Sequence, residues 1–163
     1  IAVDAIKAAA SHHHFVSITK SGHVAVFKTK GNEDCHVILR GGKQPNFDAP
    51  SVNAACGELA TSGLRQQVMI DFSHANSSKQ YQRQLDVGHD VAAQLAAGDK
   101  RIMGVMIESH LVAGRQDLKP GVTLTYGQSI TDACVSWDDT EPLLRELAEA
   151  VRNRRLAQPG DDQ

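Results

Sequence analysis

The sequence predicts an α/β fold in which short parallel strands alternate with helices. Three short apolar runs, at residues 36–40, 67–72 and 102–107, have the composition of buried strands, and helical patterns separate them. Strands that alternate with helices in this way are typical of parallel βα units. The chain of 163 residues, 41% of them hydrophobic, is long enough to form one ordinary domain with a real core.

The amino-terminal part predicts a helix followed by a β-hairpin. Residues 1–10 lack an initiator Met and read as the middle of a helix, so we expect the sequence to be a piece of a longer protein. Residues 15–19 and 24–27 are short apolar runs on either side of a glycine-containing turn, which predicts a hairpin over residues 15–28. The run His12–His14 is interpreted as a polar connector rather than a metal site.

Three further helices are expected, two between the strands and one near the end of the chain. Helical patterns cover residues 51–64 and 78–97, and Gly98 stops the second of them. Thr140 is a suitable N-cap for a last helix. The side chains expected to face the core are Leu85, Ala92 and Leu95 in the helix at 78–97, and Leu143, Leu144, Leu147 and Val151 in the last helix.

Two segments show no periodic pattern. Residues 110–129 contain several glycines and a proline, which predicts a long loop. This loop is either a lid over an active site or a solvated excursion. Residues 159–163 are polar and are expected to form a flexible tail.

The composition excludes several classes of protein. A net charge of −2, a pI near 6.5 and only 4% aromatic residues argue against nucleic acid as a partner. No apolar stretch approaches the ~20 residues that a membrane helix needs, so we expect no membrane association. Three cysteines, an odd number without paired zinc spacing, are expected to be reduced thiols in the cytoplasm.

Polar side chains occur where strands end, and three of them suggest a metal site. His74 and Glu108 each follow an apolar run, and Asp132 closes the long loop. The carboxyl ends of parallel strands open on one face, so these residues can converge there. One imidazole and two carboxylates suit Mn²⁺, Fe²⁺, Co²⁺ or Zn²⁺. The pattern equally allows His74 to be a hydrogen-bonded capping residue and Asp132 to be a turn residue or an N-cap.

A second candidate binding feature is the turn Arg40-Gly41-Gly42-Lys43 at the tip of the first apolar run. An arginine binds phosphate or carboxylate with two parallel hydrogen bonds, and glycines let backbone N–H groups approach an anion. The alternative is a surface turn with solvated charges.

Four longer motifs resemble the type I class of 3-deoxy-D-arabino-heptulosonate 7-phosphate (DAHP) synthase. They occur in the order of that family, and the resemblance runs from about His12 to Arg155. The motifs are HVILRGGK with PN at 36–46, DFSHANSSKQ at 71–80, GVMIESH at 104–110 and YGQSITDAC at 126–134.

The resemblance implies part of a (β/α)₈ TIM barrel, with about three parallel barrel strands and outer helices. It implies an enzyme that condenses phosphoenolpyruvate with erythrose 4-phosphate, releases phosphate and opens the shikimate pathway. His74, Glu108 and Asp132 match three of the family's four metal ligands, and Arg40 matches a residue that binds phosphoenolpyruvate. His74 and Asp132 are expected to be catalytic, with Asp132 also orienting the sugar phosphate.

The hairpin resembles the inserted strands where an aromatic amino acid binds as feedback inhibitor. Phe15, Ser17 and Phe27 match that site, and Ser17 makes it most like the phenylalanine-sensitive form. Residues 1–158 are therefore expected to be the carboxyl-terminal half of such an enzyme, and to form a homo-oligomer. The fourth ligand, a cysteine, and a Lys-Pro-Arg-Thr substrate loop belong to the other half and are not in this sequence.

Two other functions remain open from the sequence. The chain could be a regulatory fragment that binds an aromatic amino acid without catalysis. It could also be an unrelated metal-dependent barrel hydrolase whose histidine and carboxylates arose by convergence.

Overall fold

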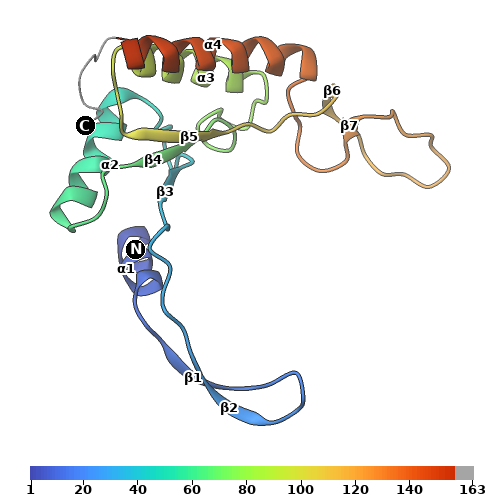
Figure 1. Cartoon of the computed structure of the whole chain (residues 1–163). Coiled ribbons are helices and arrows are strands. Elements are labelled where there is room, and N and C mark those ends of the chain that lie inside the picture. The colour runs from blue at the N-terminus through green and yellow to red at the C-terminus, as the bar shows by residue number, and fades with distance from the viewer. Residues whose placement is uncertain (157–163) are drawn as a thin grey trace. The chain divides into compact units, whose positions relative to one another are not determined.

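The computed structural model describes residues 1–156, which form two compact units (Figure 1). The first unit is Ile1–Val37 and the second begins at Ile38. The tail expected at residues 159–163 lies outside the described residues. Within residues 1–156, no helix has the length and apolar character needed to span a membrane.

The first unit is a helix followed by a two-stranded hairpin. Helix α1 (Ala2–Ala10) leads into β1 (His14–Ile18), which pairs antiparallel with β2 (Val24–Lys28). Phe15 lies opposite Phe27 in the register of this pair. The hairpin predicted at residues 15–28 is therefore present in the structure.

A glycine allows the chain to return past the end of α1. Gly31 has a φ of +86°, and a Cβ atom added to it would lie 2.1 Å from the carbonyl oxygen of Ala10. The next residue, Asn32, donates its backbone N–H to the carbonyl of Ala9 at 2.8 Å. A side chain at position 31 would break this close approach, because both the space and the backbone conformation exclude one.

The second unit contains the three strands that the sequence predicts. Strands β3 (Val37–Leu39), β4 (Val68–Asp71) and β5 (Ile102–Met106) lie side by side in the order β3-β4-β5, although the first residue of β3 belongs to the first unit. Strands β4 and β5 run parallel, with Asp71 opposite Met106. The α/β class is therefore confirmed.

Helices α2 (Ala49–Thr61), α3 (Arg83–Ala96) and α4 (Trp137–Leu156) complete this unit, and α3 packs directly against α4 (Figure 1). Gly88 permits the close packing, because a Cβ atom there would lie 2.7 Å from the Leu143 side chain. The core between helices and sheet includes side chains that are at most 2% exposed: Val52, Ile70, Phe72, Val91 and Leu143.

The helix that was predicted to begin at residue 78 begins instead at Arg83. Ser78 and Lys79 have φ values of 53° and 60°, in the left-handed region, so a right-handed helix cannot run through them. Helix α2 begins two residues earlier than predicted because Asp48 is its N-cap and accepts from the backbone N–H of Ser51 at 3.0 Å.

The last helix also begins earlier than expected. Ser136 precedes Trp137, and its hydroxyl accepts from the backbone N–H of Asp139 at 3.1 Å, as an N-cap does. Thr140, expected to be the cap, is buried within the helix and donates to the carbonyl of Ser136 at 2.7 Å.

The inward-facing side chains are largely those predicted. Ala92, Leu95, Leu143 and Leu147 are buried, Leu85 and Val151 are half-buried, and Leu144 is 42% exposed.

The segment at residues 110–129 is more ordered than a loop. It contains β6 (Val112–Arg115) and β7 (Gln128–Ser129), which pair in parallel. Gln116 ties the excursion between them together: its side-chain amide accepts from the Thr125 N–H and donates to the Thr125 carbonyl, both at 2.8 Å. These strands could not be predicted from the sequence, because they are short and contain few apolar residues.

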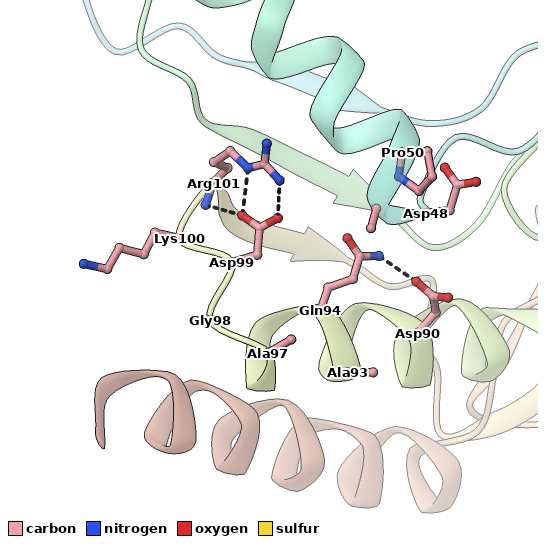
Figure 2. A pocket seen from close by; sticks show the side chains of 11 residues that line it. Asp48, Pro50, Asp90, Ala93, Gln94, Ala97, Gly98, Asp99, Lys100 and Arg101 are labelled. Atoms are coloured by element: carbon pink, nitrogen blue, oxygen red, sulfur yellow. Dashed lines mark hydrogen bonds and ion pairs between the residues drawn. The ribbon is translucent and has the colours of Figure 1, made fainter. Parts of the chain in front are cut away.

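An ion pair fixes the turn before β5 (Figure 2). The Arg101 guanidinium donates to both carboxylate oxygens of Asp99, at 3.0 and 2.7 Å, and to Asn53 of α2 at 2.9 Å. From α4, Arg154 donates to the backbone carbonyl of Asp99 at 3.0 Å. The hydrogen bonds from Arg101 hold the pKa of Asp99 below its ordinary value of 3.8.

Candidate active site

All four residues that the sequence singled out for chemistry line one pocket of the second unit. The pocket has a volume of about 420 Å³ and is lined by Arg40, His74, Glu108 and Asp132, with Lys79 also on its wall. Strand β4 leads to His74, β5 leads to Glu108, and the segment after β7 carries Asp132. The carboxyl ends of β4 and β5 therefore face this pocket, as expected for a parallel sheet.

The imidazole of His74 is held from one side. His74 is itself in the left-handed region, with a φ of 53°, within a tight turn after β4. Its Nδ1 lies 2.7 Å from Oδ2 of the buried residue Asp71, and its Nε2 lies 3.8 Å from Oε1 of Glu108. A proton on Nδ1 would let the imidazole donate to this carboxylate, and Nε2 of a neutral ring would then keep its lone pair.

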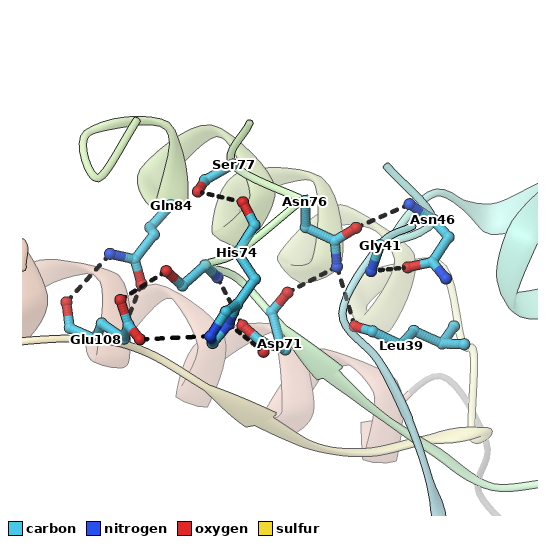
Figure 3. Close-up of polar contacts among 10 residues, drawn as sticks. Leu39, Gly41, Asn46, Asp71, His74, Asn76, Ser77, Gln84 and Glu108 are labelled. Atoms are coloured by element: carbon cyan, nitrogen blue, oxygen red, sulfur yellow. Dashed lines mark hydrogen bonds and ion pairs between the residues drawn. The ribbon is translucent and has the colours of Figure 1, made fainter. Parts of the chain in front are cut away.

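Glu108 is held through both its backbone and its side chain (Figure 3). The amide of Gln84 accepts from the Glu108 N–H at 2.8 Å and donates to the Glu108 carbonyl at 3.1 Å. The hydroxyl of Ser73 donates to Oε2 of Glu108 at 2.7 Å. Gln84 is fully buried in α3, so this clamp connects the tip of β5 to the helix that follows β4.

Asn76 connects the turn after β4 with the turn after β3 (Figure 3). Its amide nitrogen donates to the carbonyls of Leu39 and Asp71, at 3.0 and 2.7 Å. Its amide oxygen accepts from the backbone N–H of Asn46 at 2.8 Å, and Asn46 in turn accepts from Gly41 at 2.7 Å. The turn that follows Arg40 is thereby fixed to the turn that carries His74.

Gly41 allows the turn after β3 to pack against the turn after β4. Its φ is +76°, and a Cβ atom there would lie 2.7 Å from the Ala75 Cβ and 2.8 Å from the backbone nitrogen of Asn76. The backbone of Ala75 donates to the carbonyl of Arg40 at 3.2 Å, so the two turns pack directly on each other. Arg40 itself is exposed at the edge of the pocket.

The three expected metal ligands share the pocket without forming a closed set. Among residues 1–156, no group of three histidine, cysteine or acidic side chains is close enough to hold an ion. His74 and Glu108 approach each other, whereas Asp132 is exposed and lies apart from them on the pocket wall. The donor types fit a divalent cation, because an open imidazole nitrogen and carboxylate oxygens are its usual ligands.

Cys134 follows these residues but is not part of the pocket lining. Burial raises the pKa of its thiol, which a hydrogen bond with Ser129 only partly offsets. Because Cys134 does not line the pocket, the structure gives it no role as a substitute for the cysteine ligand of the family.

Sequence reasoning missed the residues that hold this site in place. Asp71, Ser73, Asn76 and Gln84 are all buried and polar, and each makes hydrogen bonds to a residue of another strand or turn. A buried polar side chain needs a partner, but its exposure cannot be read from a pattern. The only sequence signal was the concentration of polar residues at 71–77 directly after an apolar run.

Comparisons with known proteins agree on one family. The model of the DAHP synthetase I family matches residues 1–145. A phospho-2-dehydro-3-deoxyheptonate aldolase of Haemophilus influenzae is 58% identical over 158 residues, which cover 96% of this chain and 44% of the relative. The Phe-sensitive enzyme of that name from Escherichia coli K12 is 58% identical over 155 residues, covering 95% and 44%.

More distant relatives show the same pattern. A tyrosine-inhibited enzyme of that name from Schizosaccharomyces pombe is 52% identical over 163 residues, which cover 97% of this chain and 44% of the relative. A solved structure of phospho-2-dehydro-3-deoxyheptonate aldolase from Francisella tularensis superposes with a TM-score of 0.85 at 50% identity, over 94% of this chain and 45% of that one. The chain therefore spans less than half the length of the curated relatives that it matches.

Proposed function

The chain belongs to the DAHP synthetase I family, and from this premise we propose that it carries the carboxyl-terminal half of a DAHP synthase. The complete enzyme would condense phosphoenolpyruvate with erythrose 4-phosphate to give DAHP and phosphate. The observation that carries the proposal is the single pocket lined by Arg40, His74, Glu108 and Asp132. Four segments of the chain, those that follow β3, β4, β5 and β7, supply these side chains.

The fold proposal follows from the strand order. Strands β3, β4 and β5 would be three neighbouring strands of a (β/α)₈ barrel, with α2 and α3 on its outside. The remaining strands would come from the part of the relatives that this sequence does not cover. Residues 1–158 would then act as one functional half, with the hairpin at 15–28 inserted into it.

His74, Glu108 and Asp132 would hold a divalent cation, with Mn²⁺, Fe²⁺, Co²⁺ and Zn²⁺ as the candidates. Nε2 of His74 is open toward the pocket, and Ser73 occupies only one of the two carboxylate oxygens of Glu108. A bound cation would polarise the aldehyde of the sugar phosphate. Asp132 would have to move toward the other two ligands, because the three do not form a closed set.

The cationic residues of the pocket would bind the substrates. The guanidinium of Arg40 can hold the carboxylate or the phosphate of phosphoenolpyruvate with two hydrogen bonds, and Lys79 adds a second cation to the pocket lining. Holding two anions side by side brings the enol carbon within reach of the aldehyde carbon, which is the bond to be formed. Asp132, which lines the same pocket, would orient the sugar phosphate.

The hairpin would bind phenylalanine as feedback inhibitor. In the observed register, Phe15, Ser17 and Phe27 lie on one face of the hairpin, because side chains two apart on a strand share a face. The rings of Phe15 and Phe27 stack with centroids 5.7 Å apart and are 49% and 37% exposed. A third aromatic ring could extend this stack while the Ser17 hydroxyl contacts its polar end.

The experiment measures DAHP formation by the full chain, alone and mixed with the amino-terminal half of the Escherichia coli relative, in the presence of Mn²⁺. We expect activity only in the mixture, and its loss when EDTA removes the metal. The His74→Ala variant should lose activity by at least 10³-fold and lose stoichiometric Mn²⁺ binding. The Cys134→Ala variant is the matched control and should keep both.

Two results would contradict the proposal. Full Mn²⁺ binding by the His74→Ala variant would remove His74 from the ligand set. Phenylalanine binding in calorimetry without phosphoenolpyruvate binding, and without activity in the mixture, would favour the regulatory fragment instead.

A further inference from the structure

Asp71 makes two hydrogen bonds inside the site, one with each carboxylate oxygen (Figure 3). Oδ1 accepts from the backbone N–H of Ser73 at 2.8 Å, and Oδ2 lies 2.7 Å from Nδ1 of His74. Asp71 is the last residue of β4 and only 4% exposed. Burying a carboxylate this deeply costs free energy unless it is hydrogen-bonded. The contacts with Ser73 and His74 supply these partners to Asp71.

We propose that Asp71 and Ser73 are positioning residues that set the geometry of His74 and Glu108. Asp71 fixes the imidazole in the tautomer that carries its proton on Nδ1, so that the lone pair of Nε2 faces the pocket. Ser73 turns the carboxylate of Glu108 by donating to Oε2 at 2.7 Å, which leaves Oε1 on the side of His74. This inference rests on the proposed function in so far as His74 and Glu108 are taken as metal ligands.

A histidine that binds a metal through Nε2 must carry its remaining ring proton on Nδ1. A neutral imidazole exchanges its proton between two nitrogens, and only the unprotonated nitrogen can bind a metal. The opposite tautomer would place the lone pair of Nδ1 against the lone pairs of Asp71, which is repulsive. Metal-binding histidines are commonly fixed in this way by a carboxylate, and loss of such a partner typically weakens metal binding 10–100-fold.

The two contacts are coupled through Asp71. Its Oδ1 holds the backbone of Ser73, and the side chain of Ser73 holds Glu108, so one buried carboxylate orients groups on the tips of both β4 and β5. Gln84 fixes the backbone of Glu108 independently. Loss of Ser73 should therefore free the carboxylate of Glu108 to rotate without displacing its backbone.

The first test is the tautomer of His74 in the metal-free chain, read from long-range ¹H–¹⁵N NMR spectra at a pH where imidazoles are neutral. The signals are assigned by their absence in the His74→Ala variant. We expect the proton on Nδ1. A proton on Nε2 in the unmodified chain overturns the inference, and this measurement needs no variant at the Asp71 position to fold.

The second test uses Asp71→Asn, which keeps the size of the side chain but can present an N–H group to Nδ1. We expect the His74 proton to shift toward Nε2, and Mn²⁺ affinity in calorimetry to fall by 10–100-fold. Rescue by Asp71→Glu is not expected, because the longer side chain cannot serve both Ser73 and His74 in this geometry. An unchanged tautomer together with Mn²⁺ affinity within twofold of the parent overturns the role of Asp71.

Ser73→Ala tests the other half of the inference. It should weaken Mn²⁺ binding about tenfold and leave the His74 tautomer unchanged. The matched control is Ser77→Ala on the same turn, because Ser77 is also buried but its hydroxyl donates to the His74 backbone carbonyl, at 3.3 Å, rather than to Glu108. Equal weakening by both variants would mean that Ser73 only supports the turn, which overturns its positioning role.

The outcomes separate this inference from the proposed function. If the unmodified chain binds no Mn²⁺, the metal site of the proposed function fails, while the NMR result still decides the role of Asp71. If Mn²⁺ binds and the Asp71→Asn variant behaves like the parent, the positioning inference fails and the metal site stands.

Discussion

Single residues in the candidate site differ in how far the sequence reveals them. Arg40, His74 and Glu108 were found because a polar residue after an apolar run indicates a strand tip. Asp71 was not predicted as a site residue, because it lies within a run that is otherwise apolar. A sequence pattern does not distinguish a buried aspartate such as Asp71 from an exposed one. The network that orders the site therefore depends on three-dimensional proximity between residues such as Ser73 and Glu108, which are 35 positions apart.

The adjacent glycines of the turn after β3 give a prediction at this scale. Gly41→Ala should destabilise the chain by about 1–3 kcal/mol, because the added Cβ meets Ala75 and the φ of +76° is strained for alanine. Gly42→Ala is the matched control: a Cβ there meets nothing within 4 Å, so its effect should be small. Urea unfolding measures both. Under the proposed function, phosphoenolpyruvate affinity should also fall in the Gly41 variant, because that turn positions Arg40. Equal stability of the two variants would contradict the packing argument.

At the level of elements, long and locally determined segments were predicted well. The three apolar runs form β3, β4 and β5, and β4, the central strand, is the most buried of the three. Strands β6 and β7 were missed because they are held by pairing and by Gln116 rather than by composition. The start of α3 was wrong because left-handed residues such as Lys79 leave no mark in a helical pattern.

The turn between α3 and β5 carries a pH-dependent contribution to stability. The pKa of Asp99 is lowered chiefly by its hydrogen bonds with Arg101, so folding favours the ionised carboxylate. The stabilisation is complete above the ordinary value of 3.8 and is lost as the pH falls through the lower pKa of the folded state. Asp99→Asn should therefore cost about 1–2 kcal/mol at pH 7.

The difference in unfolding free energy between parent and Asp99→Asn should shrink as the pH falls below about 4. Urea unfolding between pH 3 and 7 measures it. Asp117→Asn is a suitable control, because Asp117 is paired with Arg115 at an exposed position, where an ion pair contributes little. A parent-to-variant difference that stays constant down to pH 3 would remove Asp99 as the titrating group.

At the scale of the whole molecule, the chain leaves much apolar surface uncovered. No residue of the first unit is buried. In the second unit, β3 and β5 are the edges of an open sheet, since β4 alone has a partner on both sides. Such edges and surfaces favour association with another chain. The sequence could predict an incomplete fold from the resemblance, but not which surfaces would lie open, because exposure is a property of the assembled structure.

The hairpin supplies the most specific prediction of self-association. On the face opposite the stacked phenylalanines, four aliphatic side chains are 67–73% exposed: Val16, Ile18, Val24 and Val26. Burying each of them against a second copy would contribute about 1–2 kcal/mol. We therefore expect a concentration-dependent oligomer in sedimentation velocity, and its dissociation toward monomer in the double variant Val16→Lys with Val26→Lys. Placing these two lysines directly opposite each other adds charge repulsion to the lost apolar contact. The control variant Glu58→Lys changes an exposed residue of α2 and should leave the oligomer intact. Two outcomes would contradict this prediction. If the double variant associates as strongly as the parent, the contact lies elsewhere, and the open edges of β3 and β5 become the surfaces to test. A parent chain that remains monomeric at every concentration would contradict self-association through either surface.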